Sequence, residues 1–138
     1  MFEPGVQAYA ERLHHYAKFE LVELAASRAS HAEQARDEEG ERMRALRQPR
    51  ELCVAMDERG KAFDSRELSA FLAKAQQGAK DLLFLIGGDE GLCPALVTEA
   101  DAVVSLSKMT LPHRLARLVL VEQLYRAFTL LRGEPYHK

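Results

Sequence analysis

Two patterns of apolar residues alternate along the chain: continuous apolar runs, and single apolar residues spaced so that they fall on one face of a helix. The runs at 51–56, 81–86 and 102–106 predict buried strands, and FELVEL at 19–24 predicts another. Helices are expected before the first strand, between the strands, and at the C-terminal end of the chain up to Gly133. This alternation predicts an α/β fold with a largely parallel sheet that is covered on both faces.

Two helix starts have the sequence of a capping box. In this motif the first side chain accepts a hydrogen bond from the backbone N–H three residues later, and the side chain three residues later accepts one from the first backbone N–H. Ser30 followed by Glu33 predicts the start of a charged helix, and Asp64 followed by Glu67 predicts the start of an amphipathic one. Gly78 is then the expected stop of the second helix.

The totals describe an ordinary globular chain. Its 138 residues, 47% hydrophobic and 29% charged, fit a single domain over 1–138. No apolar run approaches the ~20 residues that cross a bilayer, and the N-terminus has no secretory signal, so no membrane partner is expected. Two cysteines, Cys53 and Cys93, are too few for a disulfide framework or a four-ligand zinc site. We therefore expect a cytoplasmic protein without a metal site.

Charge is distributed unevenly along the chain. From Ser105 to the end, six Lys and Arg residues stand against two acids, a balance of +4, so residues 1–104 carry −6 of the total of −2. The small total argues against a general nucleic-acid binder, and DNA is not an expected partner. The basic C-terminal third either meets a polyanion locally or consists of ordinary solvated helix faces.

Ligands of parallel α/β sheets bind beyond the carboxyl ends of the strands. Three loops are therefore candidates, namely those after Met56, Ile86 and Leu106.

The loop after Ile86 begins Gly-Gly-Asp-Glu-Gly. It lacks the Lys-Ser or Lys-Thr pair of a phosphate-binding P-loop, and its glycines have the wrong spacing for a dinucleotide fingerprint. The likeness to the glycine-acid signature of cyclic-dinucleotide cyclases also fails, because Gly91 stands where that signature ends in an aromatic residue. Two readings stay open: glycines that let a ligand approach the backbone, or a bare turn whose Asp89 and Glu90 favour the start of the next helix.

The loop after the third strand, SLSKMTLPHRLAR at 105–117, is polar but contains no glycine. Leu106, Met109 and Leu111 are suited to closing over a flat aromatic ring, while Ser107 and Thr110 offer donors and acceptors to the edge of that ring. Hydroxyl residues are also common at helix starts, so the segment taken alone is only suggestive.

Three segments, IGGDEGL, SLSKMTLPHRLARLVLVEQLYRAF and RGEPYHK, closely resemble in order and spacing the ribosomal RNA large-subunit methyltransferase H family of the SPOUT superfamily. The resemblance extends from about Val6 to Lys138. It implies a SPOUT-type α/β fold with a C-terminal trefoil knot, and a homodimer that binds S-adenosyl-L-methionine. The implied activity is S-adenosylmethionine-dependent N3-methylation of a pseudouridine in 23S ribosomal RNA, on assembled ribosomes.

The resemblance also implies roles for particular residues. The family's cofactor contacts fall on Met56, Gly87, Leu106, Ser107, Lys108, Met109, Thr110 and Leu111. The catalytic residues are expected in the C-terminal tail. His137 is a candidate general base because histidine is the residue type suited to proton transfer near neutral pH, and Tyr136 and Lys138 are expected to place the substrate base or bind phosphate. Apart from the resemblance, the basic charge of the C-terminal third makes Arg114 and Arg117 candidates for RNA binding, with ordinary solvated helix charge as the competing account. His113, at the start of the last helix, is a second candidate base.

This sequence departs from the family at its start, where relatives have a further apolar strand and a Gly-Lys turn. Two explanations stay open: the natural chain starts upstream of Met1, or this is an N-terminally shortened form in which the first strand of the family is missing from the sheet. The alternative to an active methyltransferase is a catalytically impaired ribosome-binding protein of the same fold.

Overall fold

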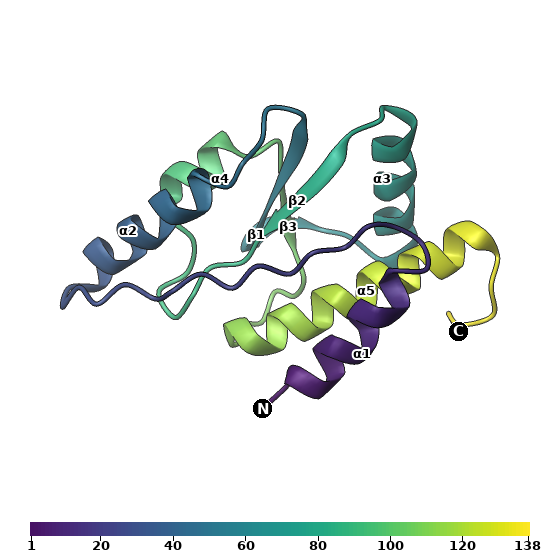
Figure 1. The fold of residues 1–138 in the computed structure, drawn as a ribbon, viewed down its shortest axis with the longest axis horizontal. Helices are drawn as coiled ribbons and strands as arrows, with labels where there is room; N and C mark the ends of the chain where they lie inside the picture. The colour runs from purple at the N-terminus through teal and green to yellow at the C-terminus, as the bar shows by residue number, and fades with distance from the viewer.

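The computed structural model describes residues 1–138 and contains five helices and three strands (Figure 1). In chain order these are α1 (Glu3–Leu13), α2 (Ala32–Arg44), β1 (Glu51–Ala62), α3 (Ser65–Gln77), β2 (Asp81–Leu85), α4 (Pro94–Glu99), β3 (Ala102–Ser105) and α5 (His113–Arg132). None of the helices is long and apolar enough to cross a membrane.

The three strands form one parallel sheet in the order β2-β1-β3, which confirms the predicted α/β class. Ala55 pairs with Leu85 on one side, and Met56 pairs with Val104 on the other. The carboxyl ends of all three strands therefore meet at the same edge. Strand β1 continues beyond a register shift between Met56 and Lys61, which makes it longer than the predicted 51–56.

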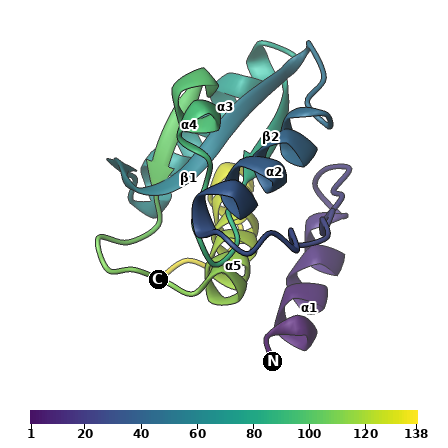
Figure 2. The same ribbon diagram turned by 90° about the vertical axis from the view of Figure 1, so that its left-hand side faces the viewer.

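Alternate residues of β2 face two separate cores. Leu82 and Phe84 pack against the core that α1, α3 and α5 form on one face. Leu83 and Leu85 belong with the smaller core on the opposite face, where α2 and α4 contribute Met43 and Leu96. The sheet is thus covered on both faces, as predicted, and α1 is the outermost helix, packed on α5 (Figure 2).

The predicted strand at 19–24 is wrong. This segment forms no regular structure and is part of the long connection that runs from α1 to α2 (Figure 1). Leu21 and Val22 are about half exposed, at 45% and 51%. A strand needs a neighbour to complete its hydrogen bonds, and no strand of the sheet pairs with this segment, so an apolar pattern alone does not make it a strand.

Only one of the two predicted capping boxes forms. At the start of α3, the Glu67 N–H donates to Asp64 Oδ1 over 2.7 Å, and the Asp64 N–H donates to Glu67 Oε1 over 3.0 Å. The prediction at Ser30 is wrong, because α2 starts one residue late for it: its N-cap is His31, which makes no side-chain cap. The Ser30 hydroxyl consequently lies outside the cap position.

Candidate functional site

The three predicted loops gather at the carboxyl edge of the sheet and touch one another. The Thr110 hydroxyl, beyond β3, donates to Glu58 Oε2 in the irregular part of β1 over 2.7 Å. His113, the first residue of α5, lies with Nδ1 3.1 Å from Asp89 Oδ1 in the glycine turn after β2. These two contacts tie the loops into one surface.

A cavity of about 300 Å³ opens beside these strand ends, on the face covered by α3 and α5. It is lined by Met56, Phe63, Asp64, Ser65, Leu68, Phe84, Val104, Ser105, Leu106, Val119, Leu120 and Gln123. Most of the lining is apolar, and the volume is at the lower end of the range for small-molecule sites. Two of the residues expected to contact a cofactor, Met56 and Leu106, are part of this lining, whereas Gly87 is not.

The rest of the loop after β3 does not line the cavity. The Ser105 hydroxyl donates to the Ser107 carbonyl over 2.8 Å, and the Met109 N–H donates to Ser107 Oγ over 2.9 Å. The Met109 side chain is 79% exposed. In this conformation the hydroxyls brace the loop itself, and the predicted cofactor contacts of Ser107, Lys108, Met109, Thr110 and Leu111 stay predictions.

The glycine turn has a structural explanation within the chain itself. Gly88 and Gly91 form an antiparallel bridge, and Gly91 has a φ of +77°. A Cβ on Gly87 would lie only 2.3 Å from the Gly91 carbonyl carbon, so only glycine fits. One of the two readings of the turn placed Asp89 and Glu90 at the start of the next helix. That placement is wrong, because α4 begins only at Pro94 and Asp89 instead faces His113.

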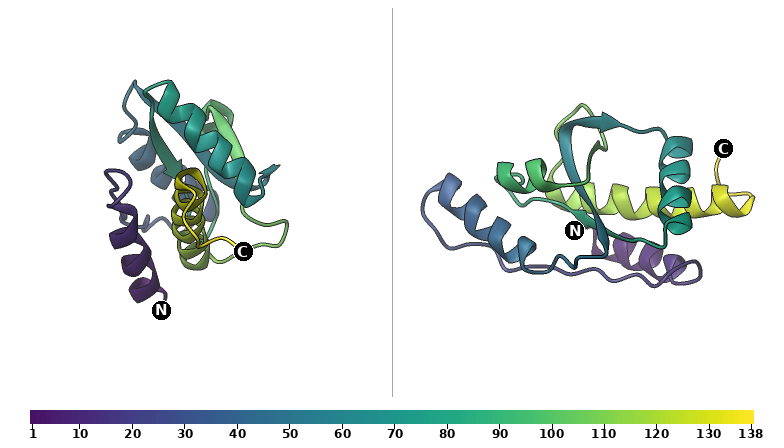
Figure 3. Two further views of the ribbon diagram at one scale, coloured as in Figure 1. Left: turned by 90° about the vertical axis from the view of Figure 1, so that its right-hand side faces the viewer. Right: turned by 90° about the horizontal axis from the view of Figure 1, so that it is seen from above.

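The C-terminal tail folds back onto α5 after Gly133, whose φ of +66° ends the helix (Figure 3). The Tyr136 hydroxyl donates to Glu122 Oε2 over 3.0 Å and lies 3.2 Å from the Tyr9 hydroxyl of α1. The pKa of Tyr136 is raised above its usual value. Burial is the largest cause, and the hydrogen bonds to Tyr9 and Glu122 add to it. The phenol is therefore a neutral donor over the physiological pH range.

Glu122 connects this tail to the cavity. It accepts from Arg126 Nη2 over 2.8 Å and from Gln123 Nε2 over 2.9 Å, in addition to Tyr136. Gln123 Oε1 in turn accepts from the Ser65 hydroxyl over 2.7 Å, and both of these residues line the cavity. A continuous hydrogen-bonded path therefore leads from the cavity to the tail.

Sequence reasoning did not identify this path. The signal available for part of it was the four-residue spacing of Glu122 and Arg126, which places opposite charges together on a helix. The bond from Ser65 to Gln123 has no such signal, because 58 positions separate the two residues.

The two arginines expected to bind RNA each face an acid of the N-terminal region. Arg114 Nη1 is 3.2 Å from Glu3 Oε1, and Arg117 Nη1 is 3.7 Å from Glu23 Oε2. Arg114 is 55% exposed and Arg117 only 20%. Exposed ion pairs of this kind are weak, so a phosphate can replace the acid at Arg114 more readily than at Arg117. RNA binding by both residues stays a prediction.

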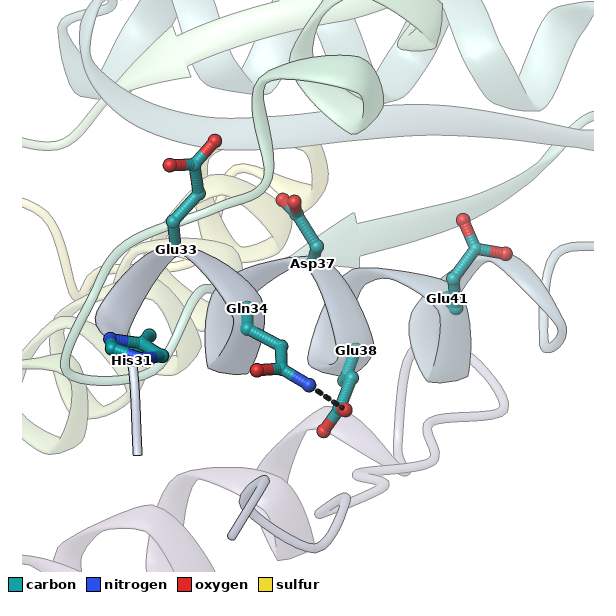
Figure 4. A pocket seen from close by; sticks show the side chains of 6 residues that line it. All are labelled: His31, Glu33, Gln34, Asp37, Glu38 and Glu41. Atoms are coloured by element: carbon teal, nitrogen blue, oxygen red, sulfur yellow. Dashed lines mark hydrogen bonds between the residues drawn. The ribbon is translucent and has the colours of Figure 1, made fainter. Parts of the chain in front are cut away.

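A second hollow lies along α2 and has a different character (Figure 4). It is lined by His31, Glu33, Gln34, Asp37, Glu38 and Glu41, all at or within this one helix, and has no apolar wall. No group of three or more His, Cys, Asp or Glu side chains in the molecule is arranged to hold a metal ion. We therefore assign the candidate site to the cavity at the strand ends.

The sequence is similar to known proteins along its whole length. Residues 1–137 match the family described as predicted SPOUT methyltransferase. A relative from Anaeromyxobacter sp. (strain Fw109-5), named Ribosomal RNA large subunit methyltransferase H, is 50% identical over 140 residues, which cover 100% of this chain and 91% of the relative. Proteins of the same name from Geobacter sp. (strain M21) and Limosilactobacillus fermentum are 42% and 43% identical, covering 96% and 99% of this chain and 87% and 91% of the relatives.

Proposed function

Because the chain belongs to the SPOUT methyltransferase family, we propose that it methylates N3 of a pseudouridine in 23S ribosomal RNA with S-adenosylmethionine as the donor. Support comes from the shared name of its relatives and from the cavity at the strand ends, where Met56 and Leu106 meet. The single observation that carries the proposal is the hydrogen-bonded path from this cavity through Gln123 and Glu122 to Tyr136 in the tail. It joins a small-molecule site to a second group of polar side chains.

The proposal includes the family's architecture. We propose a trefoil knot in the C-terminal part of the chain, a homodimer as the working unit, and a cytoplasmic location with the ribosome as partner. These features go together, since an RNA substrate is much larger than the cavity and needs a surface beyond a single protomer.

The cavity suits the proposed cofactor. Phe63, Phe84 and Leu106 supply apolar walls for a flat purine ring, and the hydroxyls of Ser65 and Ser105 lie among them as polar groups. The glycine turn and residues 106–111 then form the rim. When bound, S-adenosylmethionine supplies a methyl group on a positively charged sulfur, which is open to attack by a nucleophile from the opposite side.

The residues of this chain must align that nucleophile and exclude water. The pseudouridine N3 is an imide nitrogen, so it has to lose its proton before it can accept a methyl group. We place Tyr136, His137 and Lys138 at the substrate base, where the neutral Tyr136 phenol donates a hydrogen bond and the Lys138 cation stabilises the developing anion.

Recognition of the ribosome is expected to depend on shape rather than on charge alone. The net charge is only −2, and Arg114 and Arg117 already face acids of the chain. A protein of this kind binds free RNA weakly, since phosphate neutralisation supplies most of non-specific affinity. We expect methylation of assembled ribosomes and slow or no methylation of the naked transcript. Rapid turnover on the free transcript would contradict this expectation.

The deciding experiment measures transfer of a radiolabelled methyl group to ribosomes that carry unmethylated pseudouridine. Label in the large-subunit RNA supports the proposal. Cofactor binding without transfer favours the alternative, a ribosome-binding protein that has lost turnover, and absence of cofactor binding overturns the assignment of the cavity.

A pair of variants tests the location of the site. Leu106→Glu places a carboxylate in the cavity and should abolish both cofactor binding and transfer. Leu46→Glu is the matched control, since Leu46 is 42% exposed and does not line the cavity, and it should change neither. Circular dichroism of both variants checks that loss of binding is not loss of fold.

A further inference from the structure

We propose that His137 acts through its Nε2–H as a hydrogen-bond donor to the substrate base, with Arg126 fixing this tautomer, and that it is not the general base. The inference rests on the proposed function and refines the role of one residue within it. It replaces the base role that the sequence suggested for His137.

The geometry at Nδ1 decides the tautomer. Arg126 Nη1 lies 3.2 Å from His137 Nδ1. A guanidinium has five N–H donors and no acceptor, so Nδ1 has to be the acceptor of this bond. A neutral imidazole carries a single N–H, which must then be on Nε2. Protonation of Nδ1 would remove the bond and leave two donors facing each other.

Arg126 is held firmly enough to impose this choice. Its guanidinium donates to Glu122 in a forked arrangement, through Nε to Oε1 over 3.3 Å and through Nη2 to Oε2 over 2.8 Å. The same group lies over the Tyr136 ring, 4.8 Å from its centroid. The side chains of Arg126 and Glu122 are 24% and 18% exposed, so they form a partly buried ion pair. The forked hydrogen bonds make this pair strong and fix the orientation of the guanidinium. The titratable groups around His137 are thus Arg126, Glu122 and Tyr136, with Tyr9 behind them.

Methylation of the proposed substrate is helped by a hydrogen-bond donor beside N3, and the Nε2–H of His137 is such a donor. Once its N3 proton has left, an imide holds the negative charge largely on the two carbonyl oxygens that flank the nitrogen. A donor at either oxygen stabilises that anion, as donors in an oxyanion hole do. The N3 proton goes to water rather than to His137. The N3 electron pair then forms the new bond to the methyl carbon. The carbon–sulfur bond breaks at the same time, and its electron pair stays on sulfur.

The tautomer is measurable in the protein alone, without cofactor or RNA. We expect ¹⁵N spectra of the histidine side chains to show His137 with a pyridine-type Nδ1 and a pyrrole-type Nε2, assigned by the signals that disappear in His137→Gln. In Arg126→Met the two tautomers should both be populated, whereas Arg132→Met, which removes a cation over the Tyr16 ring, should leave the His137 signals unchanged. A pyrrole-type Nδ1 in the wild-type protein would overturn the proposal.

The role in transfer is tested by two substitutions at one position. The amide nitrogen of His137→Gln can donate from about the place of Nε2 but cannot take up a proton, whereas His137→Ala can do neither. A donor role predicts that the glutamine variant keeps kcat within about tenfold of wild type while the alanine variant loses more. A base role predicts that both lose about 10²–10⁴-fold, the usual contribution of a general base. If the wild-type protein transfers no methyl group, the proposed function fails, and the tautomer is still decided by the spectra.

Discussion

Gly87 distinguishes two explanations of the glycine turn, and replacing it with alanine separates them. The sequence suggested that this glycine lets a ligand approach the backbone. The structure instead fills the space of its missing side chain with the chain's own turn, since a Cβ there would lie 2.3 Å from the Gly91 carbonyl carbon and 2.5 Å from the Leu92 nitrogen. The φ of Gly87 is not positive, so space and not backbone conformation requires glycine.

The cost follows from the displacement needed. Ordinary contact begins near 3.4 Å, so the turn would have to move by about 1.1 Å against backbone atoms that cannot rotate away. Overpacking of this kind costs about 1–3 kcal/mol and sometimes more. Leu92 is 7% exposed and belongs to the smaller core, so movement of the turn also disturbs packing under α4. We expect Gly87→Ala to lower the free energy of unfolding by about 3 kcal/mol.

Urea unfolding without cofactor is the suitable assay, because a ligand-dependent explanation predicts no effect under that condition. Gly88→Ala is the matched control, since the nearest atom to its new Cβ is the carboxylate oxygen of Glu39 at 3.1 Å, the end of a flexible side chain. This control should lose less than about 1 kcal/mol. Our reasoning is wrong if Gly87→Ala unfolds like the wild type and only its cofactor affinity falls.

Two further predictions concern polar contacts of the C-terminal region. Glu122→Gln removes the charge that Arg126 faces. Because hydrogen bonds to charged groups are among the stronger ones, this variant should lower the stability measured by thermal unfolding by about 1–3 kcal/mol. Glu41→Gln is the control at an exposed ion pair and should change the stability by less than about 1 kcal/mol. A hydrogen bond to Glu134 is the main cause that raises the pKa of Tyr16 to about 12, above its unfolded value of 10.0, so its contribution is complete below pH 10 and is lost as pH rises towards 12. Urea unfolding from pH 9 to 12 should therefore show a steeper loss for the wild type than for Tyr16→Phe, and parallel curves would contradict this.

Local signals in the sequence predicted local structure well. The capping box of Asp64 and Glu67, the apolar run of β2 and the stop at Gly133 each depend on residues only a few positions apart, and each is present. One local signal failed, since α2 starts one residue too late for the capping box of Ser30 and Glu33. The other failures involve partners elsewhere. Segment 19–24 has a strand-like composition but no neighbouring strand, and a sequence pattern does not show which strands will be adjacent.

The candidate site divides in the same way. The loops after Met56 and Leu106 were predicted because they follow apolar strands, where ligands of parallel sheets bind. The two residues themselves were expected as cofactor contacts from the family resemblance, and both line the cavity. Ser65 and Gln123 were not predicted, since each is an ordinary polar residue on a helix until the fold brings α3 against α5. The polar path from the cavity to the tail is therefore a product of helix packing, and no motif records it.

His137 illustrates why residue type alone does not establish a catalytic role. A histidine near neutrality suggested a base, because its ordinary pKa suits proton transfer. Which nitrogen is free, however, depends on Arg126, which lies 11 positions earlier and reaches Nδ1 only because the turn at Gly133 folds the tail back along α5. Gly133, which the sequence shows only as the end of a helix, thus determines which nitrogen of His137 carries the proton. As a result His137 is a hydrogen-bond donor, although the sequence alone suggested a base.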